Sequence, residues 1–358
     1  MSGSHTRLLG RLATAVAVAV LAGAWFTWGS GREPGYVSDF DQLWHASQVA
    51  LAGRDPYAVS LAQPAPPGLP PPMGLYYPLT AVVIATPLAA LPLSVARLVW
   101  IGGAVFAFAF LAIGRFSYQR LPAVMSGAFL MAVSLGQWSP ILACAVMSPV
   151  FAWFLTGKPN VGLAAAVAVR PTMRVILLAL APVVIAFLWR PHWIADWRHA
   201  VSTAEHFRPY VLRPGGVMLV LALLRWRRPE ARWLAAIACV PGTPGVAEAL
   251  VLFAFPMTFR QCLSLALLTH APNFMMMGAQ FESFAAYTDR SSMLMLGFVY
   301  VPALFVILRR PNEGPIPSWA ERLTARWPAW LRGEPSNVSN YGTNERRTAQ
   351  RGNPDPAR

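Results

Sequence analysis

Two aspartates and a histidine crowd into one short polar stretch, which directly follows an apolar run of membrane-spanning length. Asp39, Asp41 and His45 fall near a single helical turn. A carboxylate at the low-dielectric edge of a membrane holds its proton more tightly than in water, which suits a general base. Asp39 and Asp41 are therefore candidate catalytic residues, and His45 is a candidate substrate ligand. The competing interpretation is that Asp39 only caps a helix, and the residues alone leave both open.

A second set of polar residues lies at breaks between apolar segments. Gln137 is in GQWSP, Lys158 is the only lysine of the chain, and Arg170 and Arg174 are in VRPTMR. Non-helical backbone at membrane depth is tolerated only inside protein or beside a wet cavity, so the breaks indicate an internal site. Arg170 and Arg174 are four residues apart and would form one basic face suited to a phosphate. The alternative is a positively charged cytoplasmic loop.

Tyr76 and Tyr77 stand before Pro78, where an apolar segment begins. Aromatic side chains at such a place usually form the interfacial belt of a membrane protein. Stacking of either tyrosine on a sugar is the second interpretation. Cys144, Cys239 and Cys262 lie far apart within apolar stretches and show no CxxC spacing, so we predict no metal site and no cofactor.

The composition is that of an all-α polytopic membrane protein. Of the 358 residues, 56% are hydrophobic and only 12% are charged, and the mean hydropathy is +0.45. A soluble domain usually carries about twice that share of charge. The net charge of +14 comes from arginines clustered between apolar runs and in the C-terminal tail. This is the positive-inside pattern, so we predict contact with membrane lipids and not with nucleic acid.

The chain is predicted to comprise four regions, of which the external loop and the membrane domain carry the candidate residues. The four regions are a transmembrane anchor (1–28) with a cytoplasmic N-terminus, an external loop (29–75), a multi-span membrane domain (76–310) and a disordered basic cytoplasmic tail (311–358). The external loop should carry an amphipathic juxtamembrane helix that starts at Ser38 or Asp39, with Gln42 completing a capping box, and ends at Gly53. We expect roughly 8 to 11 transmembrane helices. The number is a range because several apolar segments are too short to cross the hydrocarbon alone.

The order of these motifs resembles a known family. The stretches DFDQLWHASQVALAGRDPY, YYPLTAVVIATPLAALP, GQWSPILA and VRPTMRVILL follow one another over roughly Gly35 to Leu188, about half of the chain. Their sequence resembles glycosyltransferase family 87, the polyprenol-phosphate-mannose-dependent mannosyltransferases of bacterial envelopes, within the GT-C superfamily. Three positions depart from the family pattern: Leu79 replaces a proline, Ser139 an asparagine and Arg170 a lysine.

The resemblance implies a GT-C-like helical bundle in the bacterial plasma membrane, with its active site on the external face. Such an enzyme takes a sugar from a lipid-linked donor and passes it to an envelope glycolipid or glycan. The sugar would be mannose or another hexose, with arabinofuranose as an alternative. By motif position the catalytic aspartate falls on Asp39, with Asp41 as runner-up.

The expected reaction is an inverting transfer without a metal. Asp39 would deprotonate the acceptor hydroxyl, while Arg170, Lys158 and Arg174 would bind the donor phosphate. His45, Tyr77 and Gln137 would contact substrate. Two rival hypotheses are a transporter or flippase for an envelope lipid or sugar, and a non-catalytic relative of the enzyme.

Overall fold

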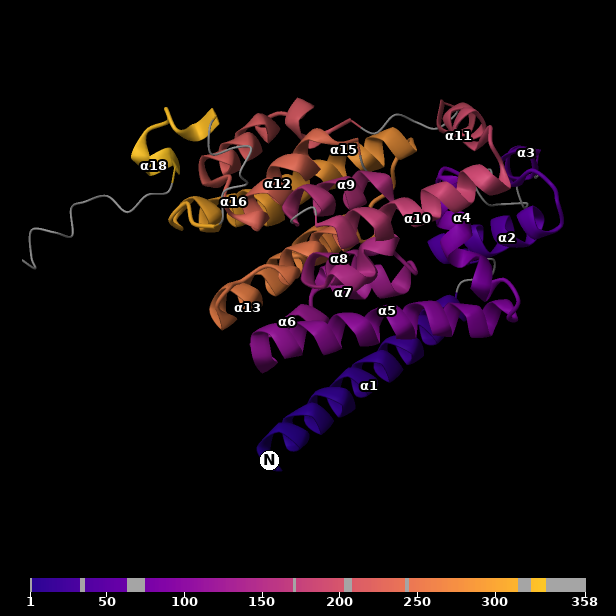
Figure 1. Cartoon of the computed structure of the whole chain (residues 1–358), viewed down its shortest axis with the longest axis horizontal. Coiled ribbons are helices and arrows are strands. Elements are labelled where there is room, and N and C mark those ends of the chain that lie inside the picture. Colours follow the sequence, from indigo (N-terminus) through magenta and orange to yellow (C-terminus); the bar gives the residue numbers. More distant parts are fainter. Residues whose placement is uncertain are drawn as a thin grey trace, which may run out of the picture.

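The computed structural model describes residues 2–32, 36–62, 75–169, 172–202, 208–241, 245–314 and 323–332. Every regular element in these ranges is a helix, and most of them are short (Figure 1). The predicted all-α class is thereby confirmed for the described part of the chain. The predicted basic tail, 311–358, lies largely outside the described residues.

Among the described residues, three helices are long and apolar enough to cross a membrane: His5–Ser30, Leu93–Val124 and Ala285–Leu308. A fourth span would result if α10 (Met173–Trp189) and α11 (Trp193–Ser202) formed one broken span, since they meet at a bend of 98°. The apolar segments that were expected to add further spans fold as short helices. The count of 8 to 11 spans and the GT-C arrangement therefore stay predictions.

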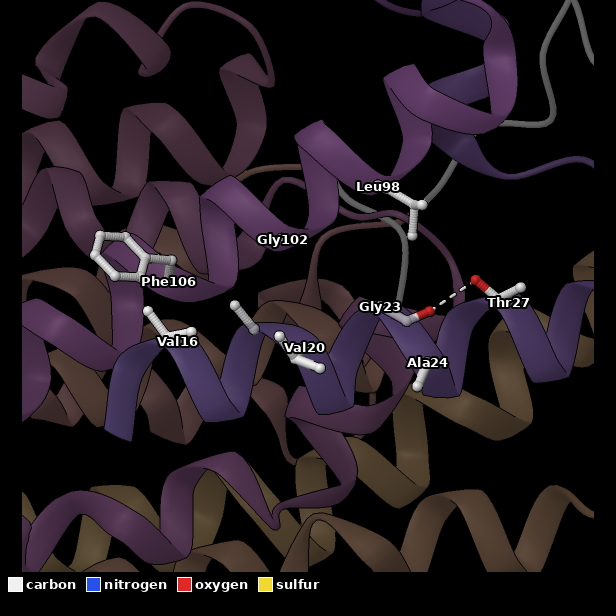
Figure 2. A pocket seen from close by; sticks show the side chains of 9 residues that line it. Val16, Val20, Gly23, Ala24, Thr27, Leu98, Gly102 and Phe106 are labelled. Carbon is white, nitrogen blue, oxygen red and sulfur yellow. Dashed lines mark hydrogen bonds between the residues drawn. The ribbon is translucent and has the colours of Figure 1, made fainter. Parts of the chain in front are cut away.

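The helices α1 (Ser2–Ser30) and α5 (Leu93–Phe116) run side by side along one flank of the molecule (Figure 1). A shallow apolar hollow of about 470 Å³ lies between them. As Figure 2 shows, its lining is aliphatic or aromatic except for Thr27, whose hydroxyl donates to the Gly23 carbonyl. The hollow therefore offers no reactive group.

Two hairpins of short helices fill the interior. The first consists of α7 (Gly127–Ser134) and α8 (Ser139–Met147), and the second of the 3-10 helix η3 (Pro149–Phe154) and α9 (Pro159–Ala168). At a rise of 1.5 Å per residue, each α-helical arm is only about 12–15 Å long. Proline begins or nearly begins α8, η3 and α9, where its missing N–H costs nothing.

The remaining elements surround these hairpins. At the end of the molecule where α1 finishes lie α2 (Asp39–Leu51), α3 (Pro56–Ala62), α4 (Leu79–Ala85) and η1 (Thr86–Leu88). The connection after α5 comprises η2 (Ser117–Arg120) and α6 (Leu121–Val124). The second half comprises η4 (Tyr210–Leu212), η5 (Gly216–Arg225), α12 (Pro229–Cys239), η6 (Val246–Ala254), α13 (Phe259–Leu268), α14 (His270–Met276), α15 (Phe284–Met295), the π-helical turn η7 (Leu296–Tyr300), α16 (Val301–Leu308) and α18 (Ala329–Arg332).

Arginines bind the carbonyl groups at the ends of several helices. Arg115 donates to the Met147 carbonyl at the end of α8, and Arg232 donates to the Ala168 carbonyl at the end of α9. The last carbonyls of a helix have no partner within it, so these bonds satisfy groups that would otherwise be unpaired. In each hairpin, the end of the second helix that lies away from the hairpin tip is therefore bound by an arginine: α8 by Arg115 and α9 by Arg232.

The tip of the second hairpin tolerates only glycine before Lys158. A methyl group built on Gly157 would overlap the ring of Trp138, which is fully buried. Gly157→Ala should therefore lower stability by about 1–3 kcal/mol through overpacking, seen as a lower thermal midpoint in detergent. Gly103→Ala is the matched control, because nothing lies within 4 Å of a methyl group there. Equal midpoints for the two variants would contradict the close contact.

Candidate active site

Asp39 is placed by a backbone hydrogen bond between two distant segments. Its N–H, at the start of α2, donates to the carbonyl of Leu135 at 3.0 Å, directly after α7. The next residue, Gly136, has φ +61°, and a methyl group there would come within 3.2 Å of Ser38. The start of α2 thus rests on the tip of the first hairpin, which brings Gln137 beside Asp39.

Two donors converge on one oxygen of the Asp39 carboxylate. The Tyr77 hydroxyl donates to Oδ2 at 2.6 Å, and Nε2 of Gln137 donates to the same atom at 2.5 Å. Within the described ranges, no side chain or backbone group donates to Oδ1. Asp39 itself is only half-buried. The carboxylate is therefore held in place through Oδ2, while Oδ1 keeps its lone pairs for a substrate proton.

Tyr77 contributes its hydroxyl to this site, whether or not it also lies at the membrane interface. Burial, the charge of Asp39 and the hydrogen bond to it raise the pKa of the Tyr77 phenol well above its usual range, so the hydroxyl remains a donor at any physiological pH. Its backbone is fixed from α3, where the Tyr57 hydroxyl donates to the Tyr77 carbonyl at 3.2 Å. Trp197 of α11 donates to the neighbouring Tyr76 carbonyl at 2.8 Å.

Lys158 approaches Asp39 through Gln137. It is buried at the tip of the second hairpin, and its Nζ donates to Oε1 of Gln137 at 2.9 Å. The same Nζ forms an ion pair with Oε1 of Glu248 at 3.0 Å. The predicted residues Asp39, Tyr77, Gln137 and Lys158 are thus gathered in one hydrogen-bonded group.

Glu248 of η6 completes this group and was not among the predicted residues. The sequence does carry a signal for it, because Glu248 is the single charged residue in the apolar run 246–255. An acidic residue inside such a run is rare unless it has a partner or a function. What the sequence could not indicate is which basic residue would be the partner, since Lys158 lies 90 positions earlier.

Asp41 has a different role from Asp39. Its carboxylate is buried and accepts two hydrogen bonds from Arg97 of α5, both at 2.7 Å, and one from the N–H of Ser38 at 2.6 Å. Ser38 is the N-cap of α2, and its N–H donates to the Asp41 carboxylate. The predicted capping box of Asp39 with Gln42 is therefore wrong, because Asp41 is the residue that accepts from the N-cap. Asp39 is the first helical residue and no mere cap, which favours it over Asp41 as a base.

The other predicted residues do not join the group. His45 is exposed on α2 and contacts the Trp44 ring edge-on, with centroids 5.0 Å apart. Arg174 is exposed in the first turn of α10. Between Lys158 and that turn runs α9, about 15 Å long, whose far end is bound by Arg232. This placement fits the alternative of a positively charged loop, and Arg170 lies outside the described residues.

No family model, curated protein or solved structure matches this chain. The resemblance to glycosyltransferase family 87 stays a prediction, and the site is interpreted from its own chemistry. In the described part of the chain, no three His, Cys, Asp or Glu side chains cluster as metal ligands would.

The two aspartates should respond differently to the same substitution. Asp41→Asn removes the charge that pairs with Arg97 and should lower the free energy of unfolding by about 1–3 kcal/mol. Asp39→Asn keeps a side chain that can still accept from Tyr77, so its thermal midpoint should remain near that of the wild type. Thermal unfolding of both variants in one detergent checks this. A larger loss for Asp39→Asn would reverse the assignment.

Proposed function

We propose that this chain is a membrane glycosyltransferase that moves a sugar from a polyprenyl-phosphate carrier to an envelope glycolipid or glycan. The single observation that carries the proposal is the Asp39 carboxylate, held through Oδ2 by Tyr77 and Gln137 with Oδ1 open. A fixed carboxylate with one open oxygen suits a general base. The order of motifs along the first half of the chain supports the same class.

The reaction would invert the configuration at the sugar. Oδ1 of Asp39 takes the proton of the acceptor hydroxyl as that oxygen forms a bond to the anomeric carbon. The bond between the anomeric carbon and the phosphate oxygen breaks, and its electron pair leaves with the polyprenyl phosphate. Because the nucleophile and the leaving group are on opposite faces of the sugar, the transfer takes place in one displacement, without a covalent sugar–enzyme intermediate.

Lys158 is the proposed partner of the departing phosphate. Its ammonium group has three hydrogens, of which Gln137 and Glu248 use two. The third could reach a phosphate oxygen beside Asp39. Arg170 is kept as a second candidate. Arg174 is not, because it is exposed on the first turn of α10 with α9 between it and Lys158.

The charges at the two ends of the molecule support an external site in a bacterial plasma membrane. The start of α1 and the ends of α5 and α16 lie at one end, and α2, α3 and α11 lie at the other (Figure 1). The first end carries the arginine clusters, whereas at the second end Arg190 is paired with two aspartates, Asp55 and Asp196. Basic residues favour the cytoplasmic side, so Asp39 would face outward.

A transporter or flippase for an envelope lipid or sugar is the second candidate. The observation in its favour is the buried Lys158–Glu248 ion pair, because paired charges inside membrane proteins often mark a substrate pathway. Transport would move the lipid or sugar without releasing polyprenyl phosphate, and the two functions are separated by that product. A non-catalytic relative would do neither.

Asp39→Asn should abolish sugar transfer while leaving donor binding intact. Purified protein in nanodiscs would be given a panel of polyprenyl-phosphate sugars and an envelope-lipid extract, with released polyprenyl phosphate as the readout. Loss of a general base lowers turnover by about 10²–10⁴-fold. The control is Asp196→Asn, a partly exposed aspartate at the same end of the molecule.

Two results would count against this scheme. Full turnover by Asp39→Asn would move the base to another residue. No transfer by the wild type from any donor, together with lipid or sugar transport in proteoliposomes, would favour the transporter.

The sidedness can be tested with cysteine labelling in a Cys239→Ser background, because Cys239 is exposed whereas Cys144 and Cys262 are buried. His45→Cys on α2 should react with a membrane-impermeant maleimide in intact cells. Tyr118→Cys, exposed at the arginine-rich end, should react only after permeabilisation. The opposite labelling pattern would invert the proposed orientation.

A further inference from the structure

We infer that the Lys158–Glu248 pair acts by fixing the orientation of the Gln137 amide, and that Glu248 is thereby a positioning residue for the base Asp39. This inference rests on the proposed function. It concerns the three linked contacts from Asp39 to Gln137, from Gln137 to Lys158, and from Lys158 to Glu248.

The first step concerns which end of the amide faces Asp39. A glutamine amide has one acceptor oxygen and one donor nitrogen at nearly equal positions, so a flip exchanges their contacts. A lysine ammonium group can only donate. Lys158 therefore requires Oε1 of Gln137 at its 2.9 Å contact, and Nε2 is left to face Asp39 Oδ2 at 2.5 Å.

The second step concerns why Glu248 is needed. The side chains of Lys158 and Glu248 are only 8% and 3% exposed. A buried ammonium group without a counter-ion is costly. Glu248 supplies the counter-ion at 3.0 Å and so holds the donor Nζ of Lys158 against Oε1 of Gln137. Glu248 lies on η6, which packs against both arms of the first hairpin and so against the segment that carries Gln137.

The third step is the consequence for Asp39. A flipped amide would place Oε1 against Oδ2 of the carboxylate, and two acceptor atoms at that distance repel each other. The carboxylate would then turn away, and Tyr77 alone would hold Oδ2. With the amide fixed, Tyr77 and Gln137 both occupy Oδ2, and Oδ1 remains the atom that receives the proton.

The decisive variant is the exchange Lys158→Glu with Glu248→Lys. It keeps a buried ion pair of the same composition but presents an acceptor-only group to Gln137, which forces the amide to flip. If the pair only stabilises the fold, the exchange should restore both the thermal midpoint and turnover relative to either single variant. If it orients the amide, the midpoint should recover while kcat remains low, on the order of 10²-fold below wild type. Because the exchange also removes the ammonium group that is proposed to contact the departing phosphate, the Gln137 amide signal described below distinguishes the two causes of a low kcat.

The matched control is Glu230→Gln. Glu230 is also a buried glutamate that pairs with arginines, Arg228 and Arg310, and it has no contact with the Asp39 group. Glu248→Gln should lower both the thermal midpoint and kcat, whereas Glu230→Gln should lower the midpoint and keep wild-type kcat. Wild-type kcat in a stably folded exchange variant would overturn the inference.

A second readout separates this inference from the proposed function. Protein labelled with 15N at glutamine side chains, in nanodiscs, should show a Gln137 amide signal, assigned by its loss in Gln137→Asn. The exchange variant should shift this signal strongly, and Glu230→Gln should leave it in place. If the wild type transfers no sugar and the exchange variant still shifts the Gln137 signal, the proposed enzyme activity is rejected and the amide orientation is retained. An unshifted signal in the exchange variant would reject the orientation whatever the activity.

Discussion

The hydrogen bond from the Asp39 N–H to the Leu135 carbonyl is the interaction on which the site depends. A helix that ends in an apolar interior leaves carbonyl groups without partners, and α7 ends there. The start of α2 supplies one missing donor, and the Trp100 indole supplies another to the Gly136 carbonyl at 3.1 Å. Contact with α2 therefore stabilises the break. The hydrogen bond that gives the Leu135 carbonyl a donor is also the contact that brings Gln137 to Asp39.

The opposite ends of the short helices meet the same constraint with arginine. A guanidinium group carries five N–H donors in a fixed plane, so it can bind two or more carbonyl groups at once. Arg232 does so at the end of α9, and Arg225 does so at the end of α16. The basic clusters thus have a structural role in addition to the orientation they suggest. Lysine, with its single mobile ammonium group, is used once, at the tip beside Gln137.

Local sequence predicted the parts of the site that depend on local rules. The helix over Asp39–Leu51 follows from a polar cap at Ser38 and a glycine at position 53, where φ is +73°. The Gly and Pro residues around Gln137 and Lys158 correctly marked breaks that lie together. Contacts between distant segments could not be predicted in this way. Arg97 as the partner of Asp41 and Glu248 as the partner of Lys158 depend on packing, which periodicity does not encode.

The number of spans shows the same limit for hydropathy. An apolar segment of eight to eleven residues is equally consistent with a broken span, a buried hairpin arm or a surface helix. The α-helical arms α7, α8 and α9 have such lengths, and the structure buries most of α8 within the protein. Hydropathy alone cannot distinguish protein from lipid as the apolar surroundings, because both exclude water.

The different fates of Asp39 and Asp41 follow from helix geometry. Successive residues of an α-helix are about 100° apart, so residues i and i+2 point to nearly opposite sides. On α2 one side faces the hairpin tips and Tyr77, and the other faces Arg97 of α5. The crowding of two carboxylates near one turn therefore does not create a shared site. It gives the helix one carboxylate that anchors it and one that remains open, and the anchor holds the open one in place.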